Sequence, residues 1–294
     1  ILADNTEIKF EKLIIATGSK AVMPKIEGAD KENVFLVKKD KEYLKIMKSR
    51  IQEANKIVIL GGGYIGVEVA DELIKEKKDV TVIEMMDSLL QSMDNEFGEK
   101  VKEILINQGG KVITGKSVQK ILGDAKVNGV ELNDNTTIDC DLLIVSVGYK
   151  PNLDLAEKFG LNFEEGKGIM VDSYLRTSVK DIFAIGDCAA KYDFFTGEFS
   201  NIMLASTAMA EGRLVGSNLY SIKVIRQYPG VLGSFSTKIG KTAFAVSGII
   251  EKRAKDRLLD YTVGVANAVD RHPGKLPGAS EVTVKLIFST YSHT

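Results

Sequence analysis

The chain has 294 residues, of which 44% are hydrophobic and 27% are charged, and its formal net charge is −1. This length is enough for two domains and part of a third. The balance of charge excludes a general attraction to nucleic acid or to an anionic membrane, and no apolar run reaches the roughly 20 residues of a membrane-spanning helix. Two cysteines cannot form a disulfide framework, so we expect a cytoplasmic protein.

The first ten residues, ILADNTEIKF, have the pattern of a strand, a turn and a second strand. A domain seldom begins within a hairpin, so we expect the chain to be an N-terminally truncated fragment. Leu13 to Ala16 is predicted as a short apolar strand. Ala21 to Lys39 is predicted as an irregular linker, and Lys41 to Ala54 as an amphipathic helix with Asp40 as its N-cap.

The most informative stretch is KIVILGGGYIGVEVADELIKEKKDVTVIE, which begins at Lys56. Its first five residues predict a buried parallel strand, and Gly61, Gly63 and Gly66 follow in G-x-G-x-x-G spacing at the start of a helix. Gly61 allows a sharp turn, Gly63 allows the backbone to approach a pyrophosphate, and Gly66 allows the helix to pack closely on the sheet. The N-terminus of the helix adds free N–H groups and about half a positive charge.

Glu84 ends the next strand, about 20 residues after Gly61, where a dinucleotide-binding fold places the acid that binds the adenosine ribose. A carboxylate accepts hydrogen bonds from a 2′-hydroxyl but repels a 2′-phosphate, by roughly 4 kcal/mol for two unit charges about 4 Å apart at an effective dielectric constant near 20. Met85 and Met86 follow, in place of an Arg or Lys that would bind a phosphate. The sequence therefore predicts NADH rather than NADPH. The alternative is a glycine-rich turn that binds nothing.

The remaining elements first alternate between strands and helices and then become antiparallel. Up to Gly148 we expect a helix at Glu96 to Gln108 and strands at Lys111 to Thr114, Val118 to Leu122, Val127 to Leu132 and Leu142 to Val147. Beyond it we expect a short helix after Pro151-Asn152, strands at Gly168 to Val171 and Ile182 to Ile185, and a helix at Ile202 to Leu219. The last part is predicted as α+β, with a hairpin at Val231 to Ser247, a helix near Glu251 to Leu258, and strands at Tyr261 to Ala266 and Val282 to Phe288.

Two other predicted strands also stop at a glycine, in LIIATGS (residues 13–19) and IFAIGDC (residues 182–188). Ligands of open α/β sheets bind outside the carboxyl ends of the strands. Asp187, directly after Gly186, is well placed there to accept hydrogen bonds from ligand hydroxyls. Alternatively, Gly18 and Gly186 only make turns and Asp187 caps the next segment, and the residues alone leave both interpretations open. No metal site is predicted.

Four motifs in this order, LIIATGS, ILGGGYIGVEVA, IVSVGYKPN and IFAIGDCA, together with the following LASTAMAEGRLVG, resemble the flavin-dependent pyridine nucleotide–disulfide oxidoreductase superfamily. Within it, Tyr64 and the C-terminal part resemble the branch of NADH oxidases and coenzyme A-disulfide reductases. The resemblance implies an α/β fold in which a Rossmann-like NAD domain is inserted in an incomplete FAD domain and is followed by a partial α+β interface domain. The implied parts are an FAD-domain remnant at 1–30, a linker and helix at 31–55, the NAD(H) domain at 56–148, the C-terminal part of the FAD domain at 149–222 and a partial dimerisation domain at 223–294.

The resemblance also implies roles for individual residues. Those implied to bind NAD(H) are Gly61, Gly62, Gly63, Tyr64, Ile65, Gly66, Glu84 and Gly148, and those implied for FAD are Thr17, Gly18, Glu68 and Asp187. Among them, Asp187 would bind the ribitol, Tyr64 would cover the flavin where the nicotinamide enters, and Glu68 would pair with a lysine near the flavin. No catalytic residue is expected in this chain, because the redox cysteine of the family lies in the upstream stretch. Cys140 and Cys188 are interpreted as structural.

The implied function is hydride transfer from NADH to FAD and then to an acceptor such as oxygen, a disulfide or sulfur, in a homodimer. Coenzyme A disulfide is less favoured, because RHPGKLP (residues 271–277) lacks the tyrosines that such reductases carry. One alternative is an NAD-binding module without turnover, since the first FAD fingerprint of the family is absent from the sequence. Another is a simple NAD dehydrogenase, which would leave the two glycine-ended strands without a role.

Overall fold

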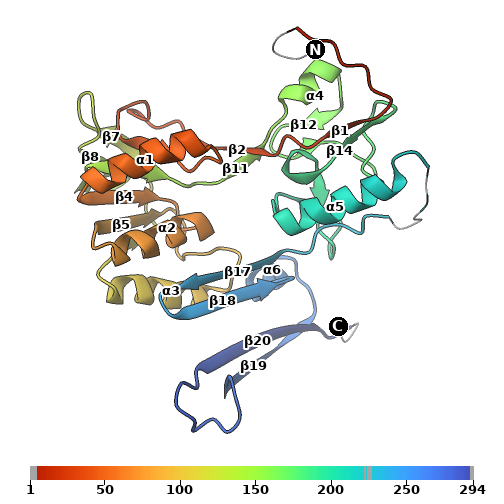
Figure 1. The fold of residues 1–294 in the computed structure, drawn as a ribbon. Coiled ribbons are helices and arrows are strands. Elements are labelled where there is room, and N and C mark those ends of the chain that lie inside the picture. Colours follow the sequence, from red (N-terminus) through yellow and green to blue (C-terminus); the bar gives the residue numbers. More distant parts are fainter. Residues whose placement is uncertain (1–4, 222, 224–226, 292–294) are drawn as a thin grey trace.

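The computed structural model describes residues 5–221, 223 and 227–291, which form two lobes and a C-terminal extension (Figure 1). The first lobe is built on a parallel sheet of five strands in the order β3-β10-β4-β5-β6. The strands are β3 (Val34–Leu36), β10 (Leu142–Val145), β4 (Lys56–Leu60), β5 (Asp79–Glu84) and β6 (Lys111–Thr114). Strand β10 is buried along its whole length, as expected for parallel strands covered on both faces. The predicted Rossmann-like α/β class is confirmed.

Three helices cover one face of this sheet: α1 (Lys41–Glu53), α2 (Tyr64–Lys75) and α3 (Asn95–Asn107). The other face packs against a small antiparallel sheet of β7 (Val118–Leu122), β8 (Gly129–Leu132) and β9 (Thr137–Asp139). The sheet also extends into the predicted linker: Val34 to Leu36 pair in parallel with Leu143 to Val145. The linker interpretation is therefore wrong for these three residues, because their pairing partner lies more than a hundred residues further along the chain.

The second lobe is built from segments that precede the first lobe in the sequence and segments that follow it. Strand β1 (Leu13–Ile15) pairs in parallel with β14 (Ile182–Ala184), and the helices are α4 (Asp154–Phe159) and α5 (Ala205–Asn218). Short pairs complete it: β12 (Phe163–Glu164) with β13 (Gly168–Ile169), and β15 (Lys191–Tyr192) with β16 (Phe199–Ser200).

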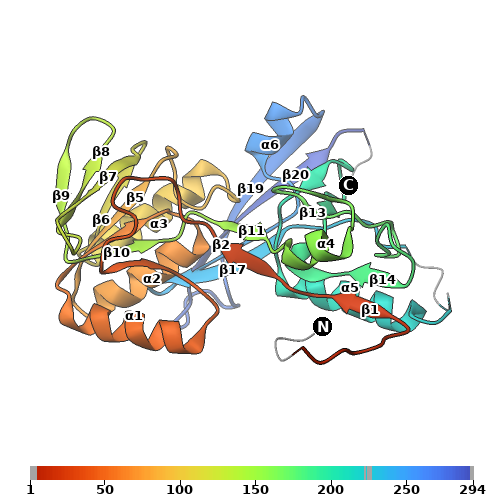
Figure 2. The ribbon, with the colours of Figure 1, turned by 90° about the horizontal axis from the view of Figure 1, so that it is seen from above.

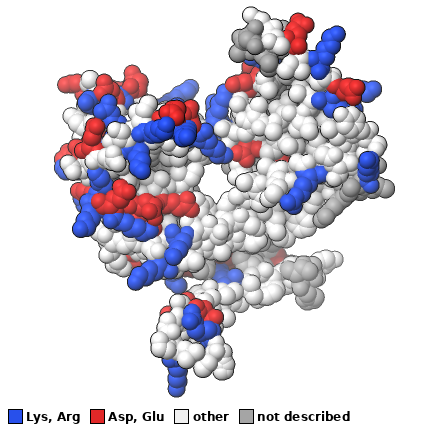
Figure 3. All heavy atoms as spheres, in the orientation of Figure 1, with Lys and Arg blue, Asp and Glu red and all other residues white. Residues whose placement is uncertain are grey.

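An antiparallel ribbon of β2 (Ser19–Ala21) and β11 (Tyr149–Pro151) connects the lobes (Figure 2). Because the chain leaves the second lobe through β2 and returns through β11, the Rossmann-like lobe is an insertion. A hollow separates the lobes on the face shown in Figure 3.

The C-terminal extension consists of two hairpins and a short helix. Hairpin β17 (Ser234–Ile239) and β18 (Thr242–Ser247) lies along α2 and α3, and α6 (Glu251–Asp256) leads to hairpin β19 (Tyr261–Val269) and β20 (Glu281–Ser289), which projects from the body (Figure 1). The last two strands are longer than predicted, because the pairing continues to Val269 and Glu281. Within the described part of the chain, no helix is both long and apolar enough to cross a bilayer.

Candidate functional site

The glycine loop at the end of β4 is pressed against the end of β10. Gly61 has φ +109°, and a Cβ there would lie 2.6 Å from the Ser146 carbonyl oxygen. A Cβ on Gly66 would lie only 1.9 Å from the Gly61 carbonyl oxygen, so the first turn of α2 contacts the loop directly. At Gly63 the same position has no atom within 4 Å. The loop is therefore tightly packed on its inner side and open on its outer side.

The open side faces the N-terminus of α2. Its N-cap, Gly63, has no side chain to accept a hydrogen bond from the first turn. The backbone N–H groups at the start of a helix have no partner within the helix and need an external acceptor. In the first turn, Tyr64 and Ile65 are partly buried, while Gly63 is exposed. Free donors, the positive end of the helix and space for a ligand thus coincide, which is the arrangement that binds phosphate groups.

Glu84 reaches this loop from the end of β5. One carboxylate oxygen accepts a hydrogen bond from the Gly62 N–H at 2.6 Å, and the other accepts one from the Met86 N–H at 2.8 Å. Both oxygens retain lone pairs for a further donor. The structure therefore brings the predicted ribose-binding acid together with the predicted phosphate-binding loop. Met85 and Met86 are exposed beside it.

Tyr64, the first residue of α2, contacts both the C-terminal extension and the Rossmann-like lobe. Its ring stacks on Phe235 of β17, with centroids 5.3 Å apart and an interplanar angle of 14°, and its hydroxyl accepts a hydrogen bond from Ser92 at 3.0 Å. Burial raises the pKa of this phenol above its usual value, so it stays neutral. One turn further along, Glu68 accepts a hydrogen bond from the Thr237 hydroxyl at 2.7 Å. These partners on β17 could not be predicted from the sequence, because they lie about 170 residues further along the chain.

A second candidate edge lies where β1 and β14 end together. The Ser19 hydroxyl donates to the Asp187 carboxylate at 2.8 Å, and the Lys39 ammonium lies 3.7 Å from the same oxygen. Gly18 has φ +69° and no atom within 4 Å of its Cβ position, while the Thr17 hydroxyl donates to the Asn152 carbonyl at 3.2 Å. The two glycine-ended strands do converge, as their parallel pairing requires. Ser19 was missed as a site residue although it lies within LIIATGS.

Gly148 comes two residues after Ser146, which packs against Gly61, and directly before strand β11 of the ribbon that joins the lobes. It has φ +120°, its Cβ position is open, and its carbonyl accepts a hydrogen bond from Val22 at 3.0 Å. The described cysteines are both free and buried, and burial raises the pKa of the Cys140 thiol to about 12. Cys140 is therefore an unreactive thiol at neutral pH.

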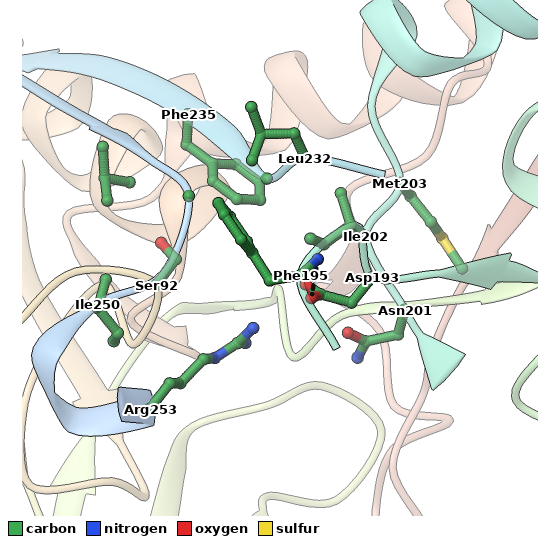
Figure 4. Close-up of a pocket in the computed structure, with 13 residues that line it drawn as sticks. Ser92, Asp193, Phe195, Asn201, Ile202, Met203, Leu232, Phe235, Ile250 and Arg253 are labelled. Carbon is green, nitrogen blue, oxygen red and sulfur yellow. Dashed lines mark hydrogen bonds between the residues drawn. The ribbon is translucent and has the colours of Figure 1, made fainter. Parts of the chain in front are cut away.

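A pocket of about 210 Å³ lies next to Tyr64, between the loop after β15 and the segment from β17 to α6 (Figure 4). It shares Phe235 and Ser92 with the contacts of Tyr64. Apolar side chains form much of its wall, namely Phe195, Ile202, Met203, Leu232, Phe235, Val246 and Ile250. The guanidinium of Arg253, the amide of Asn201 and the carboxylate of Asp193 contribute polar groups to its wall.

Comparison with known proteins agrees with this geometry. The family model described as pyridine nucleotide-disulphide oxidoreductase matches residues 2–212, which include both candidate edges. The chain belongs to this family. An NADH oxidase of Methanocaldococcus jannaschii is 33% identical over 287 residues, which cover 96% of this chain and 62% of that protein.

Solved structures of this family have the same arrangement. A NAD-dependent persulfide reductase from A. fulgidus superimposes with a TM-score of 0.89 at 34% identity, covering 97% of this chain and 52% of that one. A water-forming NADH oxidase from Lactobacillus brevis, bound to NADH, gives a TM-score of 0.88 at 28% identity, covering 97% of this chain and 62% of that one. The chain thus spans between about half and two thirds of the length of these relatives.

Proposed function

We propose that this chain is the NAD(H)-binding part, and a portion of the FAD-binding part, of a flavoprotein that takes hydride from NADH. The observation that carries the proposal is the coincidence of the open Gly63 position, the uncapped start of α2 and the Glu84 carboxylate in one loop. A dinucleotide needs these three features for its phosphates and its ribose. The second edge, with Asp187 and Gly18, lies in the other lobe and offers a carboxylate to ligand hydroxyls.

The positions of these residues indicate which part of each cofactor each of them would bind. The loop amides from Gly63 to Gly66 and the α2 N-terminus would hold the pyrophosphate, and Glu84, which already accepts the Gly62 N–H, would accept a ribose hydroxyl. Asp187, with Thr17 and Gly18 beside it, would hold the FAD. FAD, when bound, supplies the electron-accepting chemistry. Tyr64, kept neutral and stacked on Phe235, would present a flat apolar surface at the nicotinamide position, and Glu68 and Gly148 would border that position.

The acceptor of the electrons is proposed by class only. The relatives' names include a persulfide reductase and a water-forming NADH oxidase, which supports oxygen or a sulfur compound. A homodimer through residues 223–294 is part of the proposal, supported by Leu286 and Phe288, which lie on one face of β20 and are 52% and 41% exposed. A cytoplasmic location is supported by the two free thiols.

Gly63→Val tests the nucleotide site. The backbone of Gly63 has φ −74°, which any residue adopts, and its Cβ position is open, so the variant should fold. Its side chain would fill the space proposed for the pyrophosphate and weaken NADH binding at least about tenfold. Gly216→Ala is the matched control, because its Cβ position in α5 is equally open and far from the loop. Unchanged NADH affinity in Gly63→Val would refute the site.

Anaerobic titration separates the proposed function from the module without turnover. If the chain holds both cofactors, addition of NADH to the chain supplied with FAD should bleach the flavin absorbance. Binding of NADH without any bound flavin would instead favour the nucleotide-binding module. Reduction of a keto acid by a colourless chain would favour the simple dehydrogenase.

A further inference from the structure

A buried ion pair lies directly behind the Asp187 edge. The Lys191 ammonium of β15 is 2.7 Å from a carboxylate oxygen of Glu211 in α5, and the two side chains are 3% and 1% exposed. Removing two charges from water costs several kcal/mol per ion, and replacement of such pairs by apolar residues is often neutral or stabilising. Fold stability alone therefore does not account for this pair.

Both members of the pair hydrogen-bond to the backbone of the same residue, Gly186, one to its N–H and one to its C=O. The second Glu211 oxygen accepts the N–H of Gly186 at 2.6 Å, and the Lys191 ammonium donates to the Gly186 carbonyl at 2.8 Å. The three groups form a closed ring of hydrogen bonds around Gly186. The phenol of Tyr228 also lies close to the Glu211 carboxylate, and burial together with that carboxylate raises the pKa of Tyr228.

Gly186 lies just beyond the end of strand β14, where the hydrogen bonds to β1 have stopped. The pairing of β14 with β1 ends at Ala184, and the last N–H bonded to β1 is that of Ile185. Gly186 has φ +72°, a left-handed conformation that redirects the chain, and Asp187 follows at once. Glycine adopts this conformation without strain but is equally free to leave it, so contacts from its surroundings are needed to hold one conformation. Here the surroundings are the two buried charges, with the N–H of Ala189 as a further donor to the Gly186 carbonyl.

We propose that Lys191 and Glu211 are positioning residues for the flavin edge. They fix the peptide groups on both sides of Gly186 and thereby orient the Asp187 carboxylate, which accepts a hydrogen bond from the Ser19 hydroxyl at 2.8 Å. The inference rests on the proposed function, because it assigns to the aimed carboxylate the binding of FAD hydroxyls. Neither Lys191 nor Glu211 is exposed enough to touch the cofactor itself.

The double variant Lys191→Met/Glu211→Leu separates positioning from stability. It replaces both charges by apolar side chains of similar length. The desolvation cost of the pair is thereby removed while its hydrogen bonds to Gly186 are lost, so the fold should be retained. The Gly186 N–H loses a charged acceptor, so its hydrogen exchange, measured by NMR, should become at least about tenfold faster. The dissociation constant for FAD should rise by at least about tenfold for the same reason. Glu211→Gln, which keeps the shape and one acceptor oxygen, should show smaller changes in the same direction.

Lys285→Met is the matched control. The side chain of Lys285 is only 9% exposed, and its ammonium lies 2.9 Å from Asp94, 2.6 Å from Glu96 and 2.7 Å from Glu251, remote from Gly186. This control should lose stability and keep its FAD affinity and its Gly186 exchange rate. The inference is overturned if the double variant is folded and its FAD affinity stays within about twofold of the parent. A parent chain that binds NADH but no FAD would favour the nucleotide-binding module, and the exchange of Gly186 would then decide alone whether the pair holds the turn.

Discussion

Replacing Glu84 by Gln should shift the preference of the chain from NADH toward NADPH. The Glu84 carboxylate lies at the edge of the glycine loop, where it accepts the Gly62 N–H at 2.6 Å and the Met86 N–H at 2.8 Å. Gln keeps the length of the side chain and one acceptor oxygen but removes the negative charge. The variant therefore changes the electrostatics of the ribose site while leaving its shape in place.

The magnitude follows from the charge and its exposure. A phosphate oxygen about 4 Å from the carboxylate is repelled by roughly 4 kcal/mol per pair of unit charges at a dielectric constant near 20. Because Glu84 is only partly buried, water and salt reduce this repulsion, and we expect about 1–2 kcal/mol. Binding of NADPH to Glu84→Gln should then be about five to thirty times tighter than to the parent. Binding of NADH should weaken, because the ribose hydroxyl loses a charged acceptor.

Calorimetric titrations with both nucleotides at low and high salt measure these changes. The chain contains no Trp, so the fluorescence of the reduced nucleotides provides a second signal without interference. Asp79→Asn is the control, because Asp79 is an acid at the opposite end of the same strand and is paired with Lys111 at 2.8 Å. If Glu84→Gln leaves the ratio of the two dissociation constants unchanged, or if Asp79→Asn changes it equally, the assignment of Glu84 to the ribose is refuted.

Three further predictions concern the stability and reactivity of the chain. Hydrogen bonds from two lysines lower the pKa of Glu251 to about 2. The contribution of Glu251 to stability is therefore complete above its unfolded pKa, near 4.3, and is lost as the pH falls toward about 2. The urea midpoint of Glu251→Gln should depend less on pH across this range than that of the parent. Cys140, whose pKa is raised to about 12, and the buried Cys188 should be alkylated only in denaturant, as mass spectrometry will show. Asp71→Ala should destabilise the chain by about 1–3 kcal/mol in urea, because a buried carboxylate that binds the tip of hairpin β17–β18 is lost, and an unchanged midpoint would contradict this.

The glycine loop could be predicted from the sequence because its requirements are local. Gly61 needs a left-handed φ and Gly66 needs the absence of a Cβ, and both follow from the residue type and its spacing. The convergence of Gly18 with Asp187 could be anticipated from two strands that end alike. Strand β3 could not be, since three residues become a strand only through a partner over a hundred residues away.

Buried polar contacts were the other part that the sequence did not reveal. Lys191 and Glu211 read as ordinary charged residues, one after a glycine-ended strand and one within a helix of small residues. Their burial depends on tertiary packing, which places both side chains within 2.8 Å of the backbone of Gly186. Charged residues are almost never fully buried unless paired, so a sequence pattern favours a solvent-exposed position for each of them.

The contacts of α2 show why the nucleotide site and the C-terminal extension form one unit. Tyr64, Glu68 and Asp71 are spaced along one face of the helix, and each contacts the β17–β18 hairpin. Tyr64 stacks on Phe235, Glu68 accepts a hydrogen bond from the Thr237 hydroxyl at 2.7 Å, and Asp71 accepts one from the Gly240 N–H at 2.9 Å. The same helix presents its N-terminus to the glycine loop. Since α2 is a rigid element, a displacement of the hairpin would move Tyr64 and the amides of the first turn together, relative to Glu84 at the end of β5. The position of the proposed phosphate site relative to the proposed ribose site therefore depends on the C-terminal extension as well as on the Rossmann-like lobe.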